Sequence, residues 1–459
     1  MLSLSRFPQA TGGQFFNRTP TRLTGVSIDS RTLKKGNFFV ALKGNTTDGH
    51  RYLEEVFQKG ASGAMISDRD HLKEDFPNLL LVPDTEQGLL DLAAHYRSDI
   101  DSPLVAVTGS WGKTTTKELI TYLLNCRSSA YGSPGNYNTE YGLPLSLLHM
   151  PEDSNFGVFE LGTRFPGDIP RLSNILSPTL AVITGIGKVH LEQFEDHSAL
   201  VKEKLGITSG MSEGSSILVN GEGDILRDSS ITAHNRLFFG QANESASHLD
   251  YIGDHVRLKG LDGSSFRFRE GSRSRHFELR LLGRANVTNA VAALGTVREL
   301  EQPLNQLPPR LDLPPLDHRL DPIQTSFGTI LDDSYNSNPT AAKVALDLLG
   351  QCNPRGRKVA VLGDMLELGE GREDAHRQLV PHLTSANVDV VYTFGSLASV
   401  IHREIQNRDL ESILSQSFQD RGELAKQLKS DLRGKYNLVL IKGSRSLRME
   451  KIVGELIAK

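Results

Sequence analysis

The sequence predicts an α/β protein with three domains: a small N-terminal α/β domain, a central α/β domain and a C-terminal Rossmann-like α/β domain. The length of 459 residues suffices for about three domains of ordinary size. Short apolar runs alternate with amphipathic stretches, which is the pattern of parallel sheets covered by helices. A glycine-rich turn follows one of these runs near the start of the second domain. We place the domains at residues 1–101, 102–312 and 313–459.

The N-terminal domain is predicted from a strand and a helix. Phe38–Leu42 is a short apolar run typical of a strand, and Arg51–Lys59 has the spacing of an amphipathic helix. The Asp-Ser-Pro sequence at 101–103 gives the boundary, because such residues interrupt regular structure. Residues Gln302–Leu316 carry five prolines and are expected to link the central and C-terminal domains.

The other two domains are predicted from alternating strands and helices. In the central domain we expect strands at 104–107, 157–161 and 180–184, helices at 117–125 and 286–301, and short antiparallel strands within 250–282. In the C-terminal domain we expect strands at 328–333, 358–363, 389–394 and 436–442, with helices between them. This second series predicts a parallel, doubly wound sheet.

Composition excludes several classes of protein. The net charge of −4 gives no basic footprint for nucleic acid. The two cysteines, Cys126 and Cys352, are far apart, which argues against a disulfide framework and fits a reducing cytosol. No apolar run reaches the roughly 18 residues of a membrane span. We therefore expect a cytoplasmic protein without a membrane span or a nucleic-acid partner, and we expect it to be a monomer.

The glycine-rich turn lies in the segment VAVTGSWGKTTT, Val105–Thr116. Strand, glycine turn and helix in this order are the layout of a phosphate-binding loop. Gly109 and Gly112 let backbone N–H groups surround phosphate oxygens. Lys113 supplies charge for the β- and γ-phosphates, and the Thr114 hydroxyl can bind Mg²⁺. The loop is two residues shorter than the general pattern, so an ordinary glycine turn is the alternative. The preferred interpretation is a P-loop mononucleotide-binding domain that handles a nucleoside triphosphate.

Two residues follow predicted central strands. Glu160 ends the strand at 157–161, where a magnesium ligand is expected beside a phosphate loop, and an ordinary strand-end glutamate is the alternative. His190 follows the strand at 180–184, with a solvated loop histidine as the alternative. Lys204 lies on a probable helix, and by itself it would be a lysine on a solvated face.

Together these motifs resemble the Mur ligase superfamily, and the resemblance spans nearly the whole chain. The matching segments are VTGSWGKTTT at the phosphate loop, GNYNTEYGLPLSLL from Gly135, ELGTRFPGDI from Glu160, ITGIGKVHLEQF from Ile183, LLGRANVTNAVAAL from Leu281, LDDSYNSNP from Leu331, VLGDMLELG from Val361 and KGSRSLRME from Lys442. The short phosphate loop is also the form that this superfamily uses. DSYNSNP, GDMLELG and KGSRS resemble the branch that adds D-alanyl-D-alanine.

The resemblance implies an activity. ATP would phosphorylate the terminal carboxylate of UDP-N-acetylmuramoyl-tripeptide, and D-alanyl-D-alanine would displace phosphate to give the pentapeptide precursor of peptidoglycan. ATP and two Mg²⁺ ions are implied. The alternatives are a ligase that adds one amino acid, a folylpolyglutamate-type ligase, and a nucleotide-binding regulator without catalysis. SYNSNP and KGSRS argue against the first two, and the retained phosphate-loop and metal-site residues argue against the third. The third residue of the tripeptide, lysine or diaminopimelate, stays open.

The resemblance also implies roles for individual residues. The catalytic set is Lys113, His190, Lys204 and Arg319. The metal set is Thr114 and Glu160 for one Mg²⁺, with His190 and a carbamylated Lys204 for the second. The ATP set is Gly109, Ser110, Gly112, Lys113, Thr114, Thr115, Asn286, Asn289, Arg319, Asp332, Asp333, Tyr335 and Asn336. The substrate set is Ser30, Arg31, Lys43, Asp48 and His50 for the uridine nucleotide, Asn136, Asn138 and Arg164 for the muramoyl-peptide, and Asn338, Lys442, Ser444 and Arg445 in the C-terminal domain.

Some of these residues also have a simpler structural interpretation, and the sequence differs from the pattern of the superfamily at two places. The uridine-site residues could form a turn cluster, and Asn286 could be a helix N-cap. Ala285 stands where many relatives have a histidine. Lys204 is followed by Leu-Gly-Ile, where relatives often have a glutamate.

Overall fold

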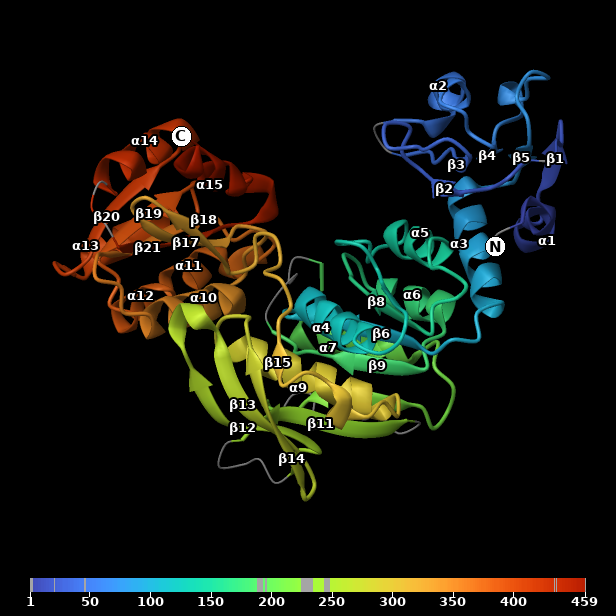
Figure 1. Ribbon diagram of the computed structural model, residues 1–459. Helices are drawn as coiled ribbons and strands as arrows, with labels where there is room; N and C mark the ends of the chain where they lie inside the picture. Colours follow the sequence, from blue (N-terminus) through green and yellow to red (C-terminus); the bar gives the residue numbers. More distant parts are fainter. Residues whose placement is uncertain are drawn as a thin grey trace.

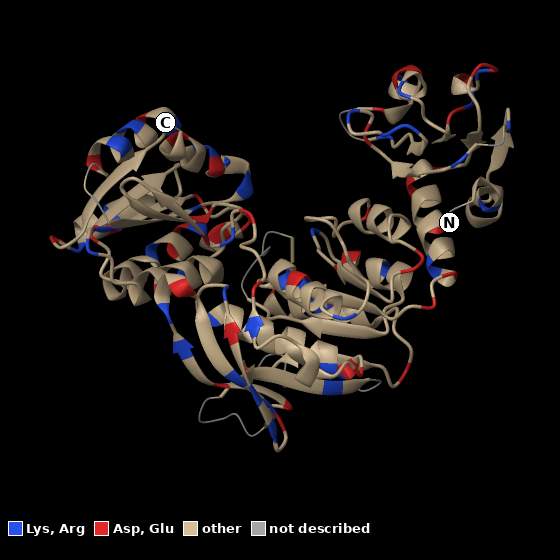
Figure 2. Cartoon of the chain, viewed as in Figure 1, with Lys and Arg blue, Asp and Glu red and all other residues tan. Residues whose placement is uncertain are grey.

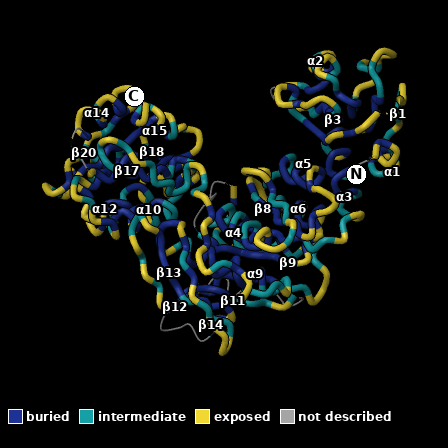
Figure 3. The backbone as a smooth tube through the Cα atoms, in the orientation of Figure 1, coloured by how far each residue is buried: buried dark blue, intermediate teal, exposed yellow. Residues whose placement is uncertain are grey.

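The computed structural model describes residues 3–19, 21–44, 47–187, 193–194, 196–223, 234–242, 248–432, 434 and 436–458. It contains three α/β units in chain order, which confirms the predicted fold class (Figure 1). The N-terminal and C-terminal units lie at opposite ends of the central unit and stand apart from each other. Buried residues follow the strands of each unit, and exposed residues line the outer helices and loops (Figure 3). Acidic and basic residues are interspersed along all three units (Figure 2).

The N-terminal unit contains a five-stranded sheet in its described part, with the order β1–β5–β4–β3–β2. Its strands are β1 (Gln14–Phe16), β2 (Gly25–Ser27), β3 (Asn37–Val40), β4 (Gly63–Ile66) and β5 (Leu79–Leu81), and its helices are α1 (Phe7–Thr11), α2 (Leu53–Gln58) and α3 (Thr85–Ser98). Phe38 and Val40 enter one apolar cluster while Phe39 enters another, because successive strand residues point to opposite faces. The helix predicted at 51–59 begins with a 3₁₀ turn, Gly49–Tyr52, so its α-helical part is shorter.

The central unit contains a ten-stranded sheet in its described part. Its spatial order is β15 (Arg310–Leu311), β14 (Arg273–Leu279), β13 (Ser264–Glu270), β12 (Tyr251–Leu258), β11 (Asn235–Gln241), β10 (Ser216–Asn220), β9 (Leu180–Ile183), β6 (Leu104–Thr108), β8 (Phe156–Glu160) and β7 (Ala130–Gly132). The segment from β7 to β12 is parallel, and β12 to β14 are antiparallel, as the sequence predicts. Its helices are α4 (Lys113–Asn125), α5 (Gly142–Leu148), α6 (Asp168–Leu176), α7 (His197–Leu205) and α9 (Arg284–Glu299).

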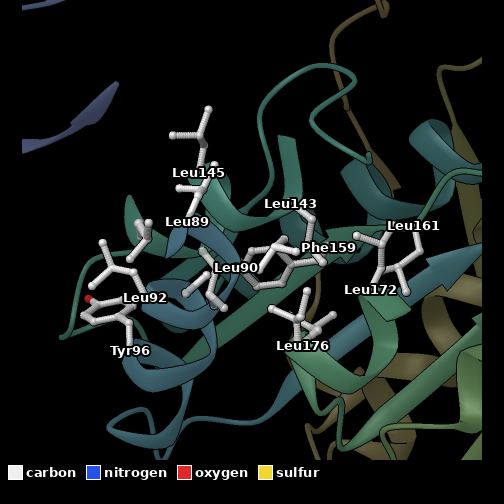
Figure 4. Close-up of a cluster of buried hydrophobic side chains, with 14 of the residues drawn as sticks. Leu89, Leu90, Leu92, Tyr96, Leu143, Leu145, Phe159, Leu161, Leu172 and Leu176 are labelled. Carbon is white, nitrogen blue, oxygen red and sulfur yellow. The ribbon is translucent and has the colours of Figure 1, made fainter. Parts of the chain in front are cut away.

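Strand β6 shows how the two faces of this sheet are covered. Leu104 and Ala106 join an apolar cluster with α5 and α6, and Val105 and Val107 join a second cluster with α4 and α9. Burial on both faces explains why β6 is continuously apolar. Helix α3 of the N-terminal unit packs into the first of these clusters (Figure 4). The polar residues that follow β6 and β8 therefore meet at one uncovered edge of the sheet.

The C-terminal unit contains a six-stranded sheet in its described part. Its spatial order is β16 (Asp321–Thr325), β17 (Gly328–Asp333), β21 (Asn437–Lys442), β18 (Lys358–Gly363), β19 (Val390–Phe394) and β20 (Leu414–Phe418). Its helices are α10 (Pro339–Gln351), α11 (Arg372–Arg377), α12 (Val380–Ser385), α13 (Ser399–Asn407), α14 (Arg421–Asp431) and α15 (Glu450–Ile457). The prediction of a parallel sheet is wrong at one edge, where β16 pairs antiparallel with β17 through a tight turn.

Three other expectations need correction. The linker expected at 302–316 includes β15, which extends the central sheet beside β14, because backbone pairing overrides its proline-rich surroundings. The helix expected from Lys117 begins at Lys113, directly after the glycine turn. The helix expected from Asn286 begins at Arg284, and Gly283 occupies its N-cap position, so the N-cap alternative for Asn286 is wrong. Among the described residues no helix is long and apolar enough to cross a membrane.

Candidate active site

The phosphate loop, residues 109–112, joins the carboxyl end of β6 to α4. Gly112 has a φ of 74°, and a Cβ there would lie 2.5 Å from Oδ1 of Asn289. A Cβ at Gly109 would lie 2.1 Å from Oγ1 of Thr184. Both positions therefore exclude any side chain. The backbone N–H of Ser110 donates to the carbonyl of Gly185 (2.7 Å), which fixes the loop against the segment after β9.

Lys113 is the first residue of α4, and Thr114 and Thr115 follow it. Its Nζ donates to the carbonyl oxygen of Gly109 (2.8 Å), so the ammonium lies over the phosphate loop. Burial lowers the pKa of Lys113, the Glu160 carboxylate raises it, and the Arg319 guanidinium lowers it. Charges from the central and C-terminal units thus act on one amine.

Glu160 joins the phosphate loop to the next segment of the site. It is 3% exposed at the carboxyl end of β8. Its Oε2 accepts a hydrogen bond from Oγ1 of Thr114 (2.6 Å), and its Oε1 accepts one from Nδ2 of Asn138 (2.7 Å). These two hydrogen bonds fix the buried carboxylate in place, and its role as a magnesium ligand stays a prediction. Two hard oxygen donors, from Thr114 and Glu160, therefore lie together beside Lys113.

Lys204 lies within the protein, which excludes the solvated-face alternative. It is 1% exposed on α7. Burial and the charge of Lys113 lower its pKa to about 7, although Glu203, Glu160 and Asp168 oppose the shift. Lys202, two residues earlier, is exposed. The helix therefore turns Lys204, and not Lys202, toward the charged groups of the phosphate site.

Arg319 lies in the segment between the central and C-terminal units. His318 and Leu320 on either side have φ values of 60° and 53°, which non-glycine residues rarely adopt. The Nδ1 atom of His318 lies 2.7 Å from Oδ2 of Asp332. The backbone N–H of Leu320 donates to Oδ1 of Asp333 (3.2 Å). The carboxylates of β17 thus impose the conformation that presents Arg319.

The ring of Tyr335 contacts two guanidinium groups. Arg319 is 4.1 Å and Arg445 is 5.4 Å from its centroid. These contacts hold both cations near the end of β17.

Lys442 and Asp333 form an ion pair beside Tyr335. The Nζ of Lys442 is 2.5 Å from Oδ2 of Asp333 and also donates to the carbonyl of Asn336 (2.9 Å). Burial raises the pKa of Asp333, and Lys442 and Arg319 oppose that shift. Lys442 thus has protein partners where a substrate carboxylate was expected, and its substrate role stays a prediction.

A cavity of about 570 Å³ lies between the central and C-terminal units, next to the phosphate loop. Trp111, Asn289 and the start of α9 line one wall, and α10 lines the other. Asn289 donates to Oδ1 of Asn286 (3.0 Å), and Asn286 donates to the carbonyl of Leu282 (2.8 Å). Of the expected adenine-side asparagines, Asn289 therefore lines a cavity large enough for a nucleoside, and Asn286 is hydrogen-bonded to it.

The residues expected to bind the uridine nucleotide lie in the N-terminal unit, away from the phosphate loop: Ser30, Arg31, Lys43, Asp48 and His50. Arg31 is exposed and paired with Asp29 at 2.6 Å. His50 is 3% exposed, with Nδ1 at 2.6 Å from Asp48 and Nε2 accepting from the backbone of Ser67 (3.0 Å). Lys43 pairs with Asp48 through the backbone, and the carbonyl of Ser30 accepts from Lys59 (2.8 Å). Their substrate contacts stay predictions.

Several other expected residues have local structural roles. Oδ1 of Asn338 caps α10 by accepting from Ala341 (2.8 Å), and Oγ of Ser444 accepts from the backbone of Leu366 (2.9 Å). Oδ1 of Asn336 accepts from the backbone of Ser337 (2.8 Å).

Three further expected residues are Asn136, Arg164 and His190. Asn136 and Arg164 are exposed, the first on the loop that carries Asn138 and the second just after β8. His190 lies outside the described residues. Within the described part of the chain, no three His, Cys, Asp or Glu side chains gather as a metal site.

Sequence reasoning missed Trp111 and Glu203. A Cβ at Gly185 or Gly187 would lie 2.5 or 2.6 Å from the indole of Trp111, so the ring rests on this glycine segment. The one tryptophan of the chain, inside a phosphate loop, was a signal that could have been used. Glu203 is buried beside Lys204, and nothing in the helical pattern distinguishes it from an exposed glutamate.

Comparison with known proteins agrees with this arrangement. Three family models match the chain in order: "Mur ligase family, catalytic domain" at residues 22–97, "Mur ligase middle domain" at 107–297 and "Mur ligase, glutamate ligase domain" at 318–445. The UDP-N-acetylmuramoyl-tripeptide–D-alanyl-D-alanine ligase of Bacillus subtilis (strain 168) is 31% identical over 453 residues, which cover 95% of this chain and 94% of the relative.

Solved structures agree over the full length. MurF from Acinetobacter baumannii superposes with a TM-score of 0.86 at 27% identity, covering 100% of this chain and 99% of that one. MurF ligase from Thermotoga maritima in complex with ADP has a TM-score of 0.81 at 29% identity, covering 95% and 97%. The chain belongs to the Mur ligase family.

Proposed function

We propose that this protein is an ATP-dependent ligase that joins D-alanyl-D-alanine to UDP-N-acetylmuramoyl-tripeptide through an acyl phosphate. The product is the pentapeptide precursor of peptidoglycan. The observation that carries the proposal is the junction of Lys113, Thr114 and Glu160 at one sheet edge, with Thr114 and Glu160 joined at 2.6 Å. The relatives that match nearly the whole chain carry the name of this ligase.

The residues present fit Mg²⁺. This ion prefers oxygen ligands and is commonly held by one or two carboxylates together with substrate phosphates. Thr114 and Glu160 offer such oxygens for one ion, and we assign His190 and Lys204 to a second. Bound there, Mg²⁺ would neutralise charge that develops on the transferred phosphoryl group.

An ammonium on Lys204 would repel a cation, so we propose that Lys204 is carbamylated. The neutral amine attacks CO₂, an N–C bond forms, and one proton is released to water. The resulting carbamate replaces a positive charge with hard oxygen donors. A pKa of about 7 supports this step, because a substantial fraction of the buried amine is neutral at physiological pH.

The chain's own residues serve both chemical steps. In the first, a carboxylate oxygen of the tripeptide attacks the γ-phosphorus of ATP, the bond to the bridging oxygen breaks, and ADP leaves. Lys113 and Arg319 would hold the phosphates and offset their charge. In the second, the amine of D-alanyl-D-alanine attacks the acyl carbon, loses a proton, and phosphate leaves from the tetrahedral intermediate.

The acyl phosphate must be protected from water. The nucleotide cavity is bounded by α10 of the C-terminal unit, so closure of that unit over the central one would exclude water. Asn286 and Asn289 would lie on the adenine side of this cavity. The N-terminal unit would bind the uridine nucleotide through Ser30, Arg31, Lys43, Asp48 and His50.

The remaining assignments follow from this arrangement. Asn136, Asn138 and Arg164 would contact the muramoyl-peptide, and Asn338, Lys442, Ser444 and Arg445 would lie toward the substrates in the closed form. Asp332, Tyr335 and Asn336 would border the nucleotide. We propose that the protein is a monomer and that it acts in the cytoplasm, where ATP is available.

Phosphate release tests the function. Purified protein is mixed with ATP, Mg²⁺ and D-alanyl-D-alanine, and with UDP-N-acetylmuramoyl-tripeptide that carries lysine or diaminopimelate. We expect release only when both substrates are present, with one product of the ligated mass. Release that is independent of D-alanyl-D-alanine, or equal rates with a single amino acid, would contradict the proposal.

A further inference from the structure

Glu203 is a buried carboxylate to which the roles proposed so far assign no part. It is 5% exposed on α7, directly before Lys204. Its Oε2 accepts from the backbone N–H of Gly167 (2.7 Å), and its Oε1 accepts from that of Ile169 (2.8 Å). One side chain of α7 therefore satisfies two backbone donors at the start of α6.

The start of α6 lacks a cap of its own. Gly167 occupies the N-cap position with a φ of 95°, and it has no side chain that could accept from the first turn. The negative charge of Glu203 is also favourable at the amino end of a helix. The carboxylate is thus required locally by the turn that precedes α6.

A second carboxylate completes this turn. Oδ2 of Asp168 accepts from the backbone N–H groups of Arg164 and Phe165, both at 2.8 Å. Glu203 and Asp168 together hold residues 164–169, the loop that follows β8 and Glu160. This loop presents Arg164 in a fixed backbone conformation.

Close packing ties α7 to α6 beyond this contact. A Cβ at Gly206 would lie 2.5 Å from Cγ of Pro170, so the backbone after α7 touches α6. Oγ of Ser173 donates to the carbonyl of Ile207 (2.5 Å) and accepts from the backbone of Gly210 (3.1 Å). Rotation of α7 would break these contacts together with those of Glu203.

We propose that Glu203 is a positioning residue of the ligase reaction, whose carboxylate fixes Lys204 beside the phosphate loop and Arg164 at the muramoyl-peptide. The inference rests on the proposed function, in which these two residues serve the acyl-phosphate step and the peptide contact. Glu203 itself touches no reacting atom. Removing this carboxylate should therefore change both kcat and KM for the tripeptide nucleotide, and it should leave KM for ATP nearly unchanged.

Steady-state kinetics of Glu203→Ala, with each substrate varied in turn, tests the inference. Since displacements near 1 Å can cost up to about 100-fold, we expect kcat to fall at least about 10-fold and KM for the tripeptide nucleotide to rise about 5-fold. KM for ATP should stay within about twofold, because neither helix forms the phosphate loop. Lys202→Ala, an exposed change on the same helix, is the matched control and should behave as wild type.

Glu203→Gln keeps the test decisive if the alanine variant does not fold. Its amide oxygen can accept one of the two N–H groups, while its NH₂ group faces the other. We expect the same split in kinetic constants with a smaller amplitude. A folded Glu203 variant with a lowered Tm but unchanged kcat and KM would overturn the positioning role and leave a purely structural one. A wild-type protein without ligase activity would contradict the proposed function and this inference with it, whereas a change confined to the variants tests Glu203 alone.

Discussion

The central unit is joined to its two neighbours by very different junctions. On the N-terminal side, one apolar cluster runs without interruption from Phe7 through α3 to the central strands (Figure 4). Leu89, Leu90 and Leu92 of α3 are at most 3% exposed. Tyr96 adds a hydrogen bond to the carbonyl of Met150 (2.9 Å). These two units share a core.

The C-terminal junction consists of narrow contacts with cavities on both sides. A Cβ at Gly283 would lie 3.8 Å from Leu348, and one at Gly260 would lie 3.7 Å from Cys352. The nucleotide cavity of about 570 Å³ lies on one side of the end of α10, and a cavity of about 840 Å³ lies on the other. Among the described residues of the central unit, Leu282 enters the C-terminal apolar cluster and the partly buried Leu261 packs against it.

The two junctions differ in how easily the units that they join can move relative to each other. A shared core resists relative motion, because separating it would expose apolar surface. Narrow contacts beside cavities let a domain rotate at lower cost. The proposed uridine site therefore lies on a unit fixed to the central one, and the proposed ATP site lies where closure can occur.

The largest effect on activity is expected at the phosphate loop, beside the junction with the C-terminal unit. Lys113→Ala should reduce ligation by about 100-fold or more, because in the proposed function the amine acts on the transferred phosphoryl group, and it contributes little to any core. Phosphate release and thermal melting measure the two effects. A variant that melts normally and ligates within about threefold of wild type would contradict the assignment.

Lys204→Ala should lose most activity, since it removes the proposed carbamate. Added acetate or formate should restore part of it by supplying a carboxylate in the vacated space. The rate of phosphate release with and without these anions is the measurement, with Lys202→Ala as control. Full activity without rescue in the alanine variant would exclude the carbamate.

Leu90→Ala tests the core that the N-terminal and central units share. Truncating a buried leucine should lower the free energy of unfolding by about 2–5 kcal/mol and destabilise the N-terminal and central units together. Denaturant unfolding, followed by Trp111 fluorescence and by circular dichroism, measures the loss of stability and shows whether the two units unfold together. The control is Leu414→Ala, at a residue that is 62% exposed, where about 0.5 kcal/mol or less is expected. A change near zero at Leu90 would mean that the units do not share a core.

Arg319→Ala should reduce turnover by about 10- to 100-fold while leaving equilibrium binding of the tripeptide nucleotide nearly unchanged. The reason is its place in the segment between β15 and β16, next to Tyr335, where the proposed closure would occur. Calorimetric titration measures binding, and phosphate release measures turnover. Collapse of nucleotide-peptide binding with intact ATP turnover would move Arg319 to the other site.

The smallest effect is expected at Tyr141, on the rim of the fixed junction. Its hydroxyl donates to Glu86 of α3 at 2.9 Å. Tyr141→Phe should cost about 1–2 kcal/mol of stability, with kcat and KM unchanged, because the residue touches neither proposed site. Denaturant unfolding and steady-state rates are the measurements. An altered kcat would show that motion at this junction also matters.

The order of elements and the principal motifs could be predicted because they depend on local pattern. The apolar run before Thr108 and the glycine turn after it already require a strand, a loop and a helix. Glu160 could be expected near Lys113 because parallel strands share a carboxyl edge. Helix boundaries were less accurate, since helices α4 and α9 begin a few residues before the predicted positions. Strand β15 was missed, because only its pairing with β14 makes it a strand.

The sequence by itself determined the fold class, the phosphate loop and the set of chemistry-bearing residues. Only the tertiary structure decided which charges meet. Lys204 looks like any helical lysine until α7 packs against α6 and buries it. Asp332 and Asp333 look like free carboxylates until they hold the strained backbone around Arg319. The physical reason is that burial and the partner of a charged group are set by elements distant in the chain, and these contacts fix its pKa and its role.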